Sequence, residues 1–144
     1  MNYNCEQRYL SLSNNDVAAF GYCPDNFIAR TDGVIIEVGN LFYELSKAER
    51  ECTMQHEIGH KHQTTLEWLF GKISRGYRNQ LEFRADYYAM QMTSQADTTQ
   101  MLERIKEMIE EGKINKRKYI KTHPSILRRI RRIRKNIKPE HYHY

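Results

Sequence analysis

Residues 56–60 read His-Glu-Ile-Gly-His, and this HExxH motif constrains the fold more than any other feature of the chain. On an α-helix of about 3.6 residues per turn, His56 and His60 project from one face, so both imidazoles can reach one tetrahedral metal ion. Glu57 follows the first ligand and can face a metal-bound water. Gly59 has no side chain, so another element can approach the helix closely. The motif therefore predicts a zinc site on a packed helix.

The residues around the motif predict the helix that it requires. Ser46 and Glu49 form the S-x-x-E pattern of a capping box, so we expect a helix from about Lys47 to His62. Upstream, the apolar runs within residues 26–38 flank Thr31-Asp32-Gly33, and an Asp-Gly pair between such runs is typical of a β-hairpin. HEIGH alone could occur by chance in a polar helix, but this context favours a metal site.

Zinc hydrolases generally use three protein ligands and leave the fourth position for water, so a third ligand is needed. His62 points to a different helix face. Glu82 lies 22 residues after His60, which leaves room for a reversal and a second helix, expected from Asn79 to about residue 93. Asp86, one turn after Glu82, could accept the second ring N–H of a ligating histidine.

The rest of the chain predicts further helices and one domain. Helices are expected from Asp97 to Gly112 and from Pro124 to Pro139, whereas residues 63–76 give no clear pattern beyond the apolar stretch LEWLF. A length of 144 residues fits a single domain over residues 1–144. With 40% hydrophobic and 28% charged residues, the composition is that of an ordinary globular protein rather than a disordered one.

The sequence also predicts a cytoplasmic protein. It has no run of about 18 apolar residues, and MNYNCEQRYL lacks the basic start and apolar centre of a signal peptide. Cys5, Cys23 and Cys52 show no CxxC spacing, so we expect reduced thiols.

Basic residues are concentrated near the carboxy terminus. Residues 113–138 hold twelve of the 23 lysines and arginines and no acidic residue. Such a segment could bind nucleic acid, an anionic membrane surface or an acidic partner, or it could simply be a solvated helix face.

Three segments in order, HEIGH, EFRADYYA and THPSILRRIRRI, resemble the gluzincin metallopeptidases that include the HtpX heat-shock proteases and the CAAX prenyl proteases. The resemblance covers about residues 25–133. It implies an α+β, mainly helical zincin-like domain in which a short β-hairpin or sheet lies beside an active-site helix and a glutamate helix. The implied zinc ligands are His56, His60 and Glu82. Glu57 would be the general base, Asp86 the acid that supports a ligand, and His123 a residue near the active site that would stabilise the oxyanion.

Two differences within this resemblance affect the expected substrate. Those relatives are embedded in membranes by hydrophobic helices that this chain lacks, so the resemblance does not imply prenylated or membrane substrates. The soluble minigluzincins are similar in size to this chain, and some of them are latent because their carboxy-terminal segment fills the cleft. A weaker resemblance is to the ImmA/IrrE proteases, since ERECTMQHEIGH and RNQLEFRADYYA suit either group.

The expected function is that of a zinc-dependent metallo-endopeptidase acting on a protein or peptide. The substrate would add to an edge strand around Val34, Ile36 and Val38, where main-chain hydrogen bonds give affinity. The alternative is a zinc-containing but latent or inactive binding protein that uses residues 113–138 on nucleic acid or an acidic partner.

Several other side chains have two readings each. Cys52 could lie near the metal or be a buried, inert thiol. Glu140, His141 and His143 could form a metal-binding tail or a frayed terminus. Four tyrosines could donate hydrogen bonds to a tetrahedral intermediate or serve only in packing: Tyr77, Tyr87, Tyr88 and Tyr119.

Overall fold

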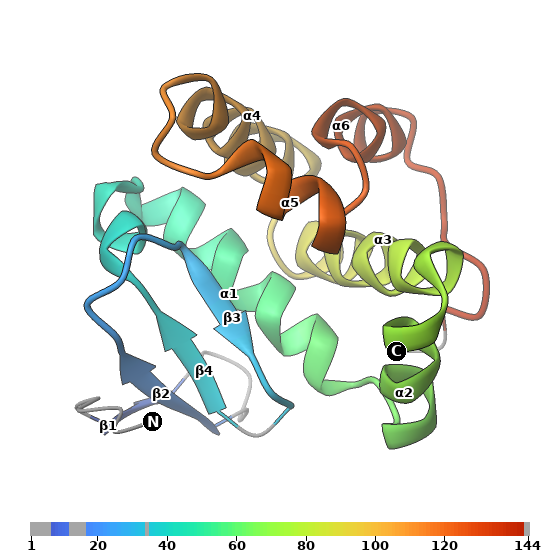
Figure 1. Cartoon of the computed structure of the whole chain (residues 1–144), viewed down its shortest axis with the longest axis horizontal. Helices are drawn as coiled ribbons and strands as arrows, with labels where there is room; N and C mark the ends of the chain where they lie inside the picture. Colours follow the sequence, from blue (N-terminus) through green and yellow to red (C-terminus); the bar gives the residue numbers. More distant parts are fainter. Residues whose placement is uncertain (1–6, 12–16, 34, 143–144) are drawn as a thin grey trace.

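The computed structural model describes residues 7–11, 17–33 and 35–142, with side chains from residue 21 onward. A four-stranded sheet precedes a layered set of helices (Figure 1). The strands are β1 (Gln7–Ser11), β2 (Val17–Tyr22), β3 (Ala29–Thr31) and β4 (Ile35–Val38), followed by the 3-10 helix η1 (Asn40–Glu44). The α-helices are α1 (Lys47–Lys61), α2 (Thr65–Ile73), α3 (Arg75–Met92), α4 (Gln95–Glu110), α5 (Lys116–Thr122) and α6 (Ile126–Arg134). This arrangement confirms the expected α+β class.

The hairpin between β3 and β4 forms where the Asp-Gly pair predicted it. The two strands are antiparallel, with Ala29 opposite Val38. Gly33 has a φ of 95°, a backbone conformation that favours glycine. The Asp32 carboxylate accepts a hydrogen bond from the backbone N–H of Ile35 at 2.9 Å. The turn therefore fixes the register of the two strands.

The expectation that β4 is the edge strand is wrong. The strand order is β1-β2-β4-β3, so β4 is internal and pairs in parallel with β2. Ile36 and Val38 are fully buried and cannot contact a substrate, and Val34 lies outside the described residues. Local sequence predicted the hairpin partner of β4 but gave no sign of the distant parallel partner. The end strand on this side is β3.

Helix α1 begins at the predicted capping box. The Glu49 backbone N–H donates to the Ser46 hydroxyl at 3.2 Å, and the Ser46 N–H donates to the Glu49 carboxylate at 2.8 Å. The helix therefore begins at Lys47, as expected, and ends one residue earlier than expected, with His62 as its C-cap.

The unassigned stretch 63–76 contains a helix and the start of the next one. Thr64 and Glu67 form a second capping box at the start of α2, a T-x-x-E signal that the sequence contained. Helix α3 begins at Arg75 with Ser74 as its N-cap, four residues before the expected start at Asn79. The helix starts earlier because the Ser74 hydroxyl caps it by accepting a hydrogen bond from the Tyr77 N–H at 3.2 Å, and the first turn accommodates Gly76.

Two apolar clusters form the core, and α1 contributes to both. The first packs β4, η1, α1, α3 and α4 together and contains Ile36, Val38, Leu41, Phe42, Leu45, Met54, Ile58, Tyr88 and Met108. The second joins α1 to α3, α4 and α6 and contains Cys52, Ala89, Met90, Met101, Leu102, Ile130 and Ile133. Helix α1 is thus held from both sides, which fixes the side chains of the HExxH motif. Among the described residues, no helix is long and apolar enough to cross a membrane.

Gly59 permits the close packing of α1 on α3. A Cβ at Gly59 would lie 2.9 Å from the Ala85 Cα, which cannot move without shifting α3. We expect Gly59→Ala to lower the free energy of unfolding by about 1–3 kcal/mol, because overpacking outweighs the gain in helix propensity. Gly76→Ala is the control: its Cβ would meet only the Ser74 hydroxyl at 3.9 Å, so stability should be unchanged or higher. Urea denaturation of both variants measures the difference, and equal effects would contradict the packing role of Gly59.

Candidate metal centre

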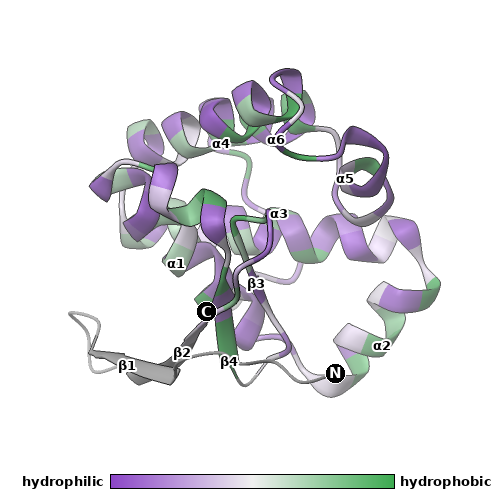
Figure 2. Cartoon of the chain, turned by 60° about the vertical axis from the view of Figure 1, so that its left-hand side comes forward, coloured by the Kyte–Doolittle hydropathy of each residue, from purple (hydrophilic) through white to green (hydrophobic). Residues whose placement is uncertain are grey.

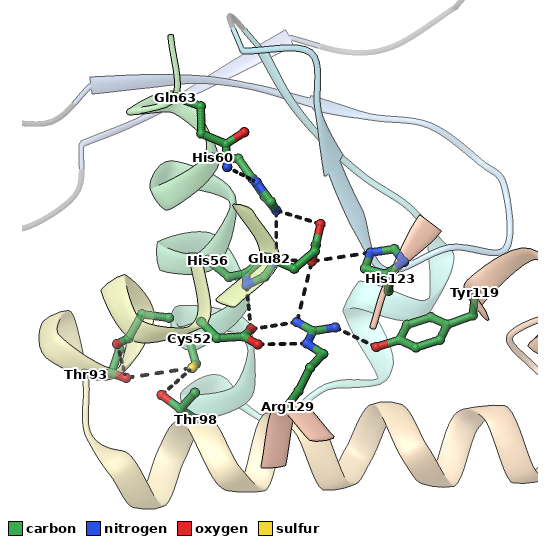
Figure 3. A network of polar contacts seen from close by, with 12 residues as sticks. Cys52, His56, His60, Gln63, Glu82, Thr93, Thr98, Tyr119, His123 and Arg129 are labelled. Carbon is green, nitrogen blue, oxygen red and sulfur yellow. Dashed lines mark hydrogen bonds and ion pairs between the residues drawn. The ribbon is translucent and has the colours of Figure 1, made fainter. Parts of the chain in front are cut away.

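Three side chains from α1 and α3 converge on one point (Figure 3). The Nε2 atoms of His56 and His60 are 3.1 Å apart. The Glu82 carboxylate places Oε2 3.5 Å from Nε2 of His56 and Oε1 3.3 Å from Nε2 of His60. The structure therefore brings together the three ligands that the sequence predicted.

These separations fit a tetrahedral metal ion. Zinc lies about 2.0–2.1 Å from its nitrogen and oxygen ligands, so neighbouring ligand atoms of a tetrahedron are about 3.3–3.4 Å apart. In addition, Oε2 of Glu82 is buried, and its polar neighbours His56, His123 and Arg129 lie 3.5, 3.8 and 3.9 Å away. This carboxylate is therefore incompletely paired, and a bound cation would stabilise it. The cluster can thus hold a metal, and two imidazoles with one carboxylate suit zinc.

The electrostatics of the cluster also suit a cation. Burial by itself would raise the pKa of Glu82, but the nearby His123 and His60 imidazoles hold that pKa well below its usual range. Burial disfavours a charged His56 ring, yet hydrogen bonds to Asp86 and Glu82 raise the pKa of His56 to about 10. Protonation of His56 would therefore compete with metal binding.

Asp86 contacts the imidazole ring of His56. Its Oδ1 lies 2.9 Å from Nδ1 of His56, so the opposite ring nitrogen, Nε2, faces Glu82 and His60. Asp86 is itself held by Arg129, which donates from Nε to Oδ2 at 2.8 Å and from Nη2 to Oδ1 at 2.6 Å. Although burial would raise the pKa of Asp86, Arg129 lowers it to about 2.

Arg129 is the residue that the sequence reasoning missed. It is 2% exposed and also donates to the Tyr119 hydroxyl. A signal existed: Arg129 lies three residues after Ile126 and four before Ile133, on the apolar stripe of α6. A charged residue within such a stripe is rarely buried unless it is paired.

Glu57 lies in a cleft of about 720 Å³ beside the three ligands. Residues 29–33 of β3 and its turn line this cleft together with residues from α1, α2 and α3. Glu57 is buried, and this burial raises the pKa of its carboxyl group. It is thus a buried carboxylate with increased basicity that lines the cleft.

His123 reaches the same cleft from the chain that follows α5. Its Nε2 lies 3.8 Å from Oε2 of Glu82, and Nδ1 is hydrogen-bonded to the Thr122 hydroxyl at 2.8 Å. The ring stacks on Tyr119, with centroids 4.6 Å apart and planes 7° from parallel (Figure 3). Burial lowers the pKa of His123.

Two other candidate ligands lie elsewhere. His62 packs against Tyr88 with a centroid distance of 5.0 Å. The Cys52 thiol donates to the Thr98 hydroxyl at 3.3 Å, and burial raises its pKa to about 11. Cys52 is therefore a buried, inert thiol. The Cys23 thiol is buried and donates to the Asp25 carboxylate at 3.5 Å, and Cys5 lies outside the described residues.

The remaining candidate side chains make packing contacts away from the three converging residues. Tyr77 contacts Phe70, Tyr87 contacts Tyr142, and Tyr88 lies in the first apolar cluster. The residues that line the cleft end at His123 in the described part of the chain. Residues 140–142 thus do not fill it, and His143 lies outside the described residues.

A sequence model of peptidase family M48 matches residues 64–137. The match covers half of the chain and includes Glu82, Asp86, His123 and Arg129, while the HExxH motif immediately precedes it. The chain therefore belongs to peptidase family M48, a family of metal-dependent peptidases. No curated protein and no solved structure matches the chain.

Proposed function

We propose that this protein is a zinc-dependent metallo-endopeptidase of the HExxH gluzincin type. One observation carries the proposal: His56, His60 and Glu82 have the spacing of three tetrahedral ligands and adjoin a cleft that contains Glu57. Three ligands leave one position open, which is typical of catalytic zinc, whereas structural zinc generally has four protein ligands.

The side chains support general acid–base hydrolysis of a peptide bond. Zinc bound here would supply Lewis-acid polarisation of the scissile carbonyl and of water. Glu57 would accept the proton of the attacking water and later donate it to the leaving amine. An N–H of His123 would stabilise the negative charge that develops on the carbonyl oxygen. Asp86 and Arg129 would keep His56 in the orientation that ligation requires.

The end strand β3 offers a place for the substrate. Ala29, Arg30 and Thr31 line the same cleft as Glu57 and His60, so an extended peptide could add to β3 and pass the metal site. Main-chain hydrogen bonds would supply affinity without a sequence requirement. This placement replaces the expected binding to β4. A resemblance to the soluble minigluzincins rather than to the ImmA/IrrE proteases remains part of the proposal.

The alternative of a silent binding protein has less support. The described carboxy-terminal residues leave the cleft open, so they give no structural basis for latency. Arg129 is buried, and Arg128 and Arg132 lie over the Phe83 ring at 5.2 and 4.4 Å. Part of the basic segment therefore serves the fold, and no finding supports nucleic-acid binding.

Zinc content tests the proposal directly. We expect about one zinc per chain after reconstitution at neutral pH and cleavage of unfolded casein that a chelator stops and added zinc restores. His60→Ala should lose the metal, because two ligands bind zinc more weakly than three. His62→Ala is the control on the same helix and should keep both metal and activity, since His62 packs on Tyr88. Absence of zinc would exclude the metal site, whereas zinc without cleavage would favour the binding protein.

A further inference from the structure

Among the described residues, helix α2 packs on α3 through one of its faces. Glu67 forms a 2.6 Å ion pair with Arg84 on α3. Gly71 packs so closely on α3 that a Cβ would lie 2.9 Å from Cδ1 of Leu81. These residues, four apart, form the face toward α3. A second face, with Trp68 and Lys72, lines the cleft.

The third face of α2 is apolar and points to solvent. Its residues are spaced i, i+3, i+4 and i+7, the pattern that usually marks a buried helix face. They are nevertheless 66%, 49%, 50% and 81% exposed: Leu66, Leu69, Phe70 and Ile73. We call these four residues the outer stripe of α2. A contiguous apolar stripe of this kind marks an interaction site more often than a monomer surface.

Positive charge is concentrated on the segments that adjoin α2, and three of these cations line the cleft: Lys61, Lys72 and Arg78. Between residues 61 and 81 the charged residues are Glu67, already paired with Arg84, and four cations: Lys61, Lys72, Arg75 and Arg78. Arg75 donates to the Ile120 carbonyl at 3.3 Å and Arg78 to the Lys121 carbonyl at 2.7 Å. These bonds hold α5 on the same side of the molecule as α2 (Figure 2). Helix α5 exposes four more cations: Lys116, Arg117, Lys118 and Lys121.

We propose that the outer stripe of α2 docks this protein on an anionic lipid bilayer. A helix of nine residues is about 14 Å long, too short to cross a hydrocarbon core of about 30 Å, so it would lie in the interface. Apolar side chains inserted at the boundary and lysines near anionic headgroups are the two contributions that hold such helices. The surface offers both together.

Other occupants fit these observations less well. The outer stripe consists of four side chains, whereas each partner of a standard protein interface contributes roughly 20–30 residues, so a second copy would be held weakly. Nucleic acid would use the cations but would leave the outer stripe exposed to water.

Docking by α2 would also bring the cleft close to the membrane surface, because Trp68 and Lys72 on the adjacent helix face line the cleft. This inference rests on the proposed peptidase function, and it implies that the substrates are protein segments exposed at a membrane surface. The binding step itself does not depend on catalysis, so Glu57→Gln should dock as well as the unaltered protein.

Cosedimentation with vesicles tests the docking. We expect the full chain to bind vesicles of equimolar phosphatidylcholine and phosphatidylglycerol, to bind phosphatidylcholine alone at least tenfold more weakly, and to dissociate as salt is added. Leu66→Glu combined with Leu69→Glu should lower partitioning to the mixed vesicles at least tenfold. Glutamate at position 66 suits the first turn of a helix, so α2 should remain folded, which circular dichroism would check.

The matched control is Leu127→Glu on α6, because Leu127 is 61% exposed, close to the 66% of Leu66. This variant should bind as the unaltered protein does. Lys118→Gln combined with Lys121→Gln should weaken binding and reduce its salt sensitivity. Absence of vesicle binding, or binding that the Leu66/Leu69 variant retains, would overturn the proposal. A dimer in light scattering that this variant converts to a monomer would also overturn it and assign the outer stripe to a second copy.

Discussion

Glu57→Gln is expected to reduce proteolysis by about 10²–10⁴-fold while zinc content and stability stay unchanged. Glu57 lines the cleft and is not one of the three converging ligands, so the amide keeps the size of the side chain and removes only its basicity. Burial raises the pKa of this carboxyl group, which strengthens it as a proton acceptor and increases what the substitution removes. Casein cleavage at saturating zinc gives the rate, and elemental analysis gives the metal content.

Glu82→Gln is the comparison that separates base from ligand. A neutral amide is a poorer zinc ligand than a carboxylate, so this variant should lose metal first and activity as a result. High zinc should partly restore Glu82→Gln but not Glu57→Gln. If Glu57→Gln cleaves casein as fast as the unaltered protein, Glu57 is not the general base. If it loses zinc, Glu57 serves the metal site rather than proton transfer.

Arg129→Met is expected to lower the free energy of unfolding by about 3–5 kcal/mol, because it leaves the buried Asp86 carboxylate without its counter-ion. Arg129 and Asp86 are each 2% exposed at the side chain and are joined by two hydrogen bonds. The same change should weaken zinc binding, since Asp86 would hold His56 less firmly. Urea unfolding measures the loss of stability. The zinc concentration is kept fixed in these experiments, because bound metal adds to the apparent stability.

Arg134→Met on the same helix is the control. Its side chain is 60% exposed and pairs with Glu103 at 2.9 Å, and exposed pairs contribute about 0–1 kcal/mol. Adding Asp86→Asn to Arg129→Met should recover part of the lost stability, because no uncompensated buried charge then remains. Equal small effects of Arg129→Met and Arg134→Met would show that the buried pair is not a stabilising element.

The sequence determined the features that depend on near neighbours. Two histidines four apart lie on one helix face wherever that helix packs, and the Ser46–Glu49 capping box requires only the residues between them. The Asp32-Gly33 turn likewise fixes its own hairpin. Glu82 and Asp86 could be predicted as well, since their i, i+4 spacing places both on the face of one helix and the resemblance supplied their roles.

Tertiary structure alone decided the features that depend on which surfaces meet. Residues far apart in sequence made β4 an internal strand, because β2 pairs with it in parallel. Arg129 became a support of the metal site because α6 packs beside α3, where Asp86 provides a buried counter-charge. The stripe of Leu66, Leu69, Phe70 and Ile73 has the periodicity of a core face, yet α2 packs through Glu67 and Gly71 instead. Helical periodicity states which residues share a face, but only packing determines whether that face meets the protein or the solvent.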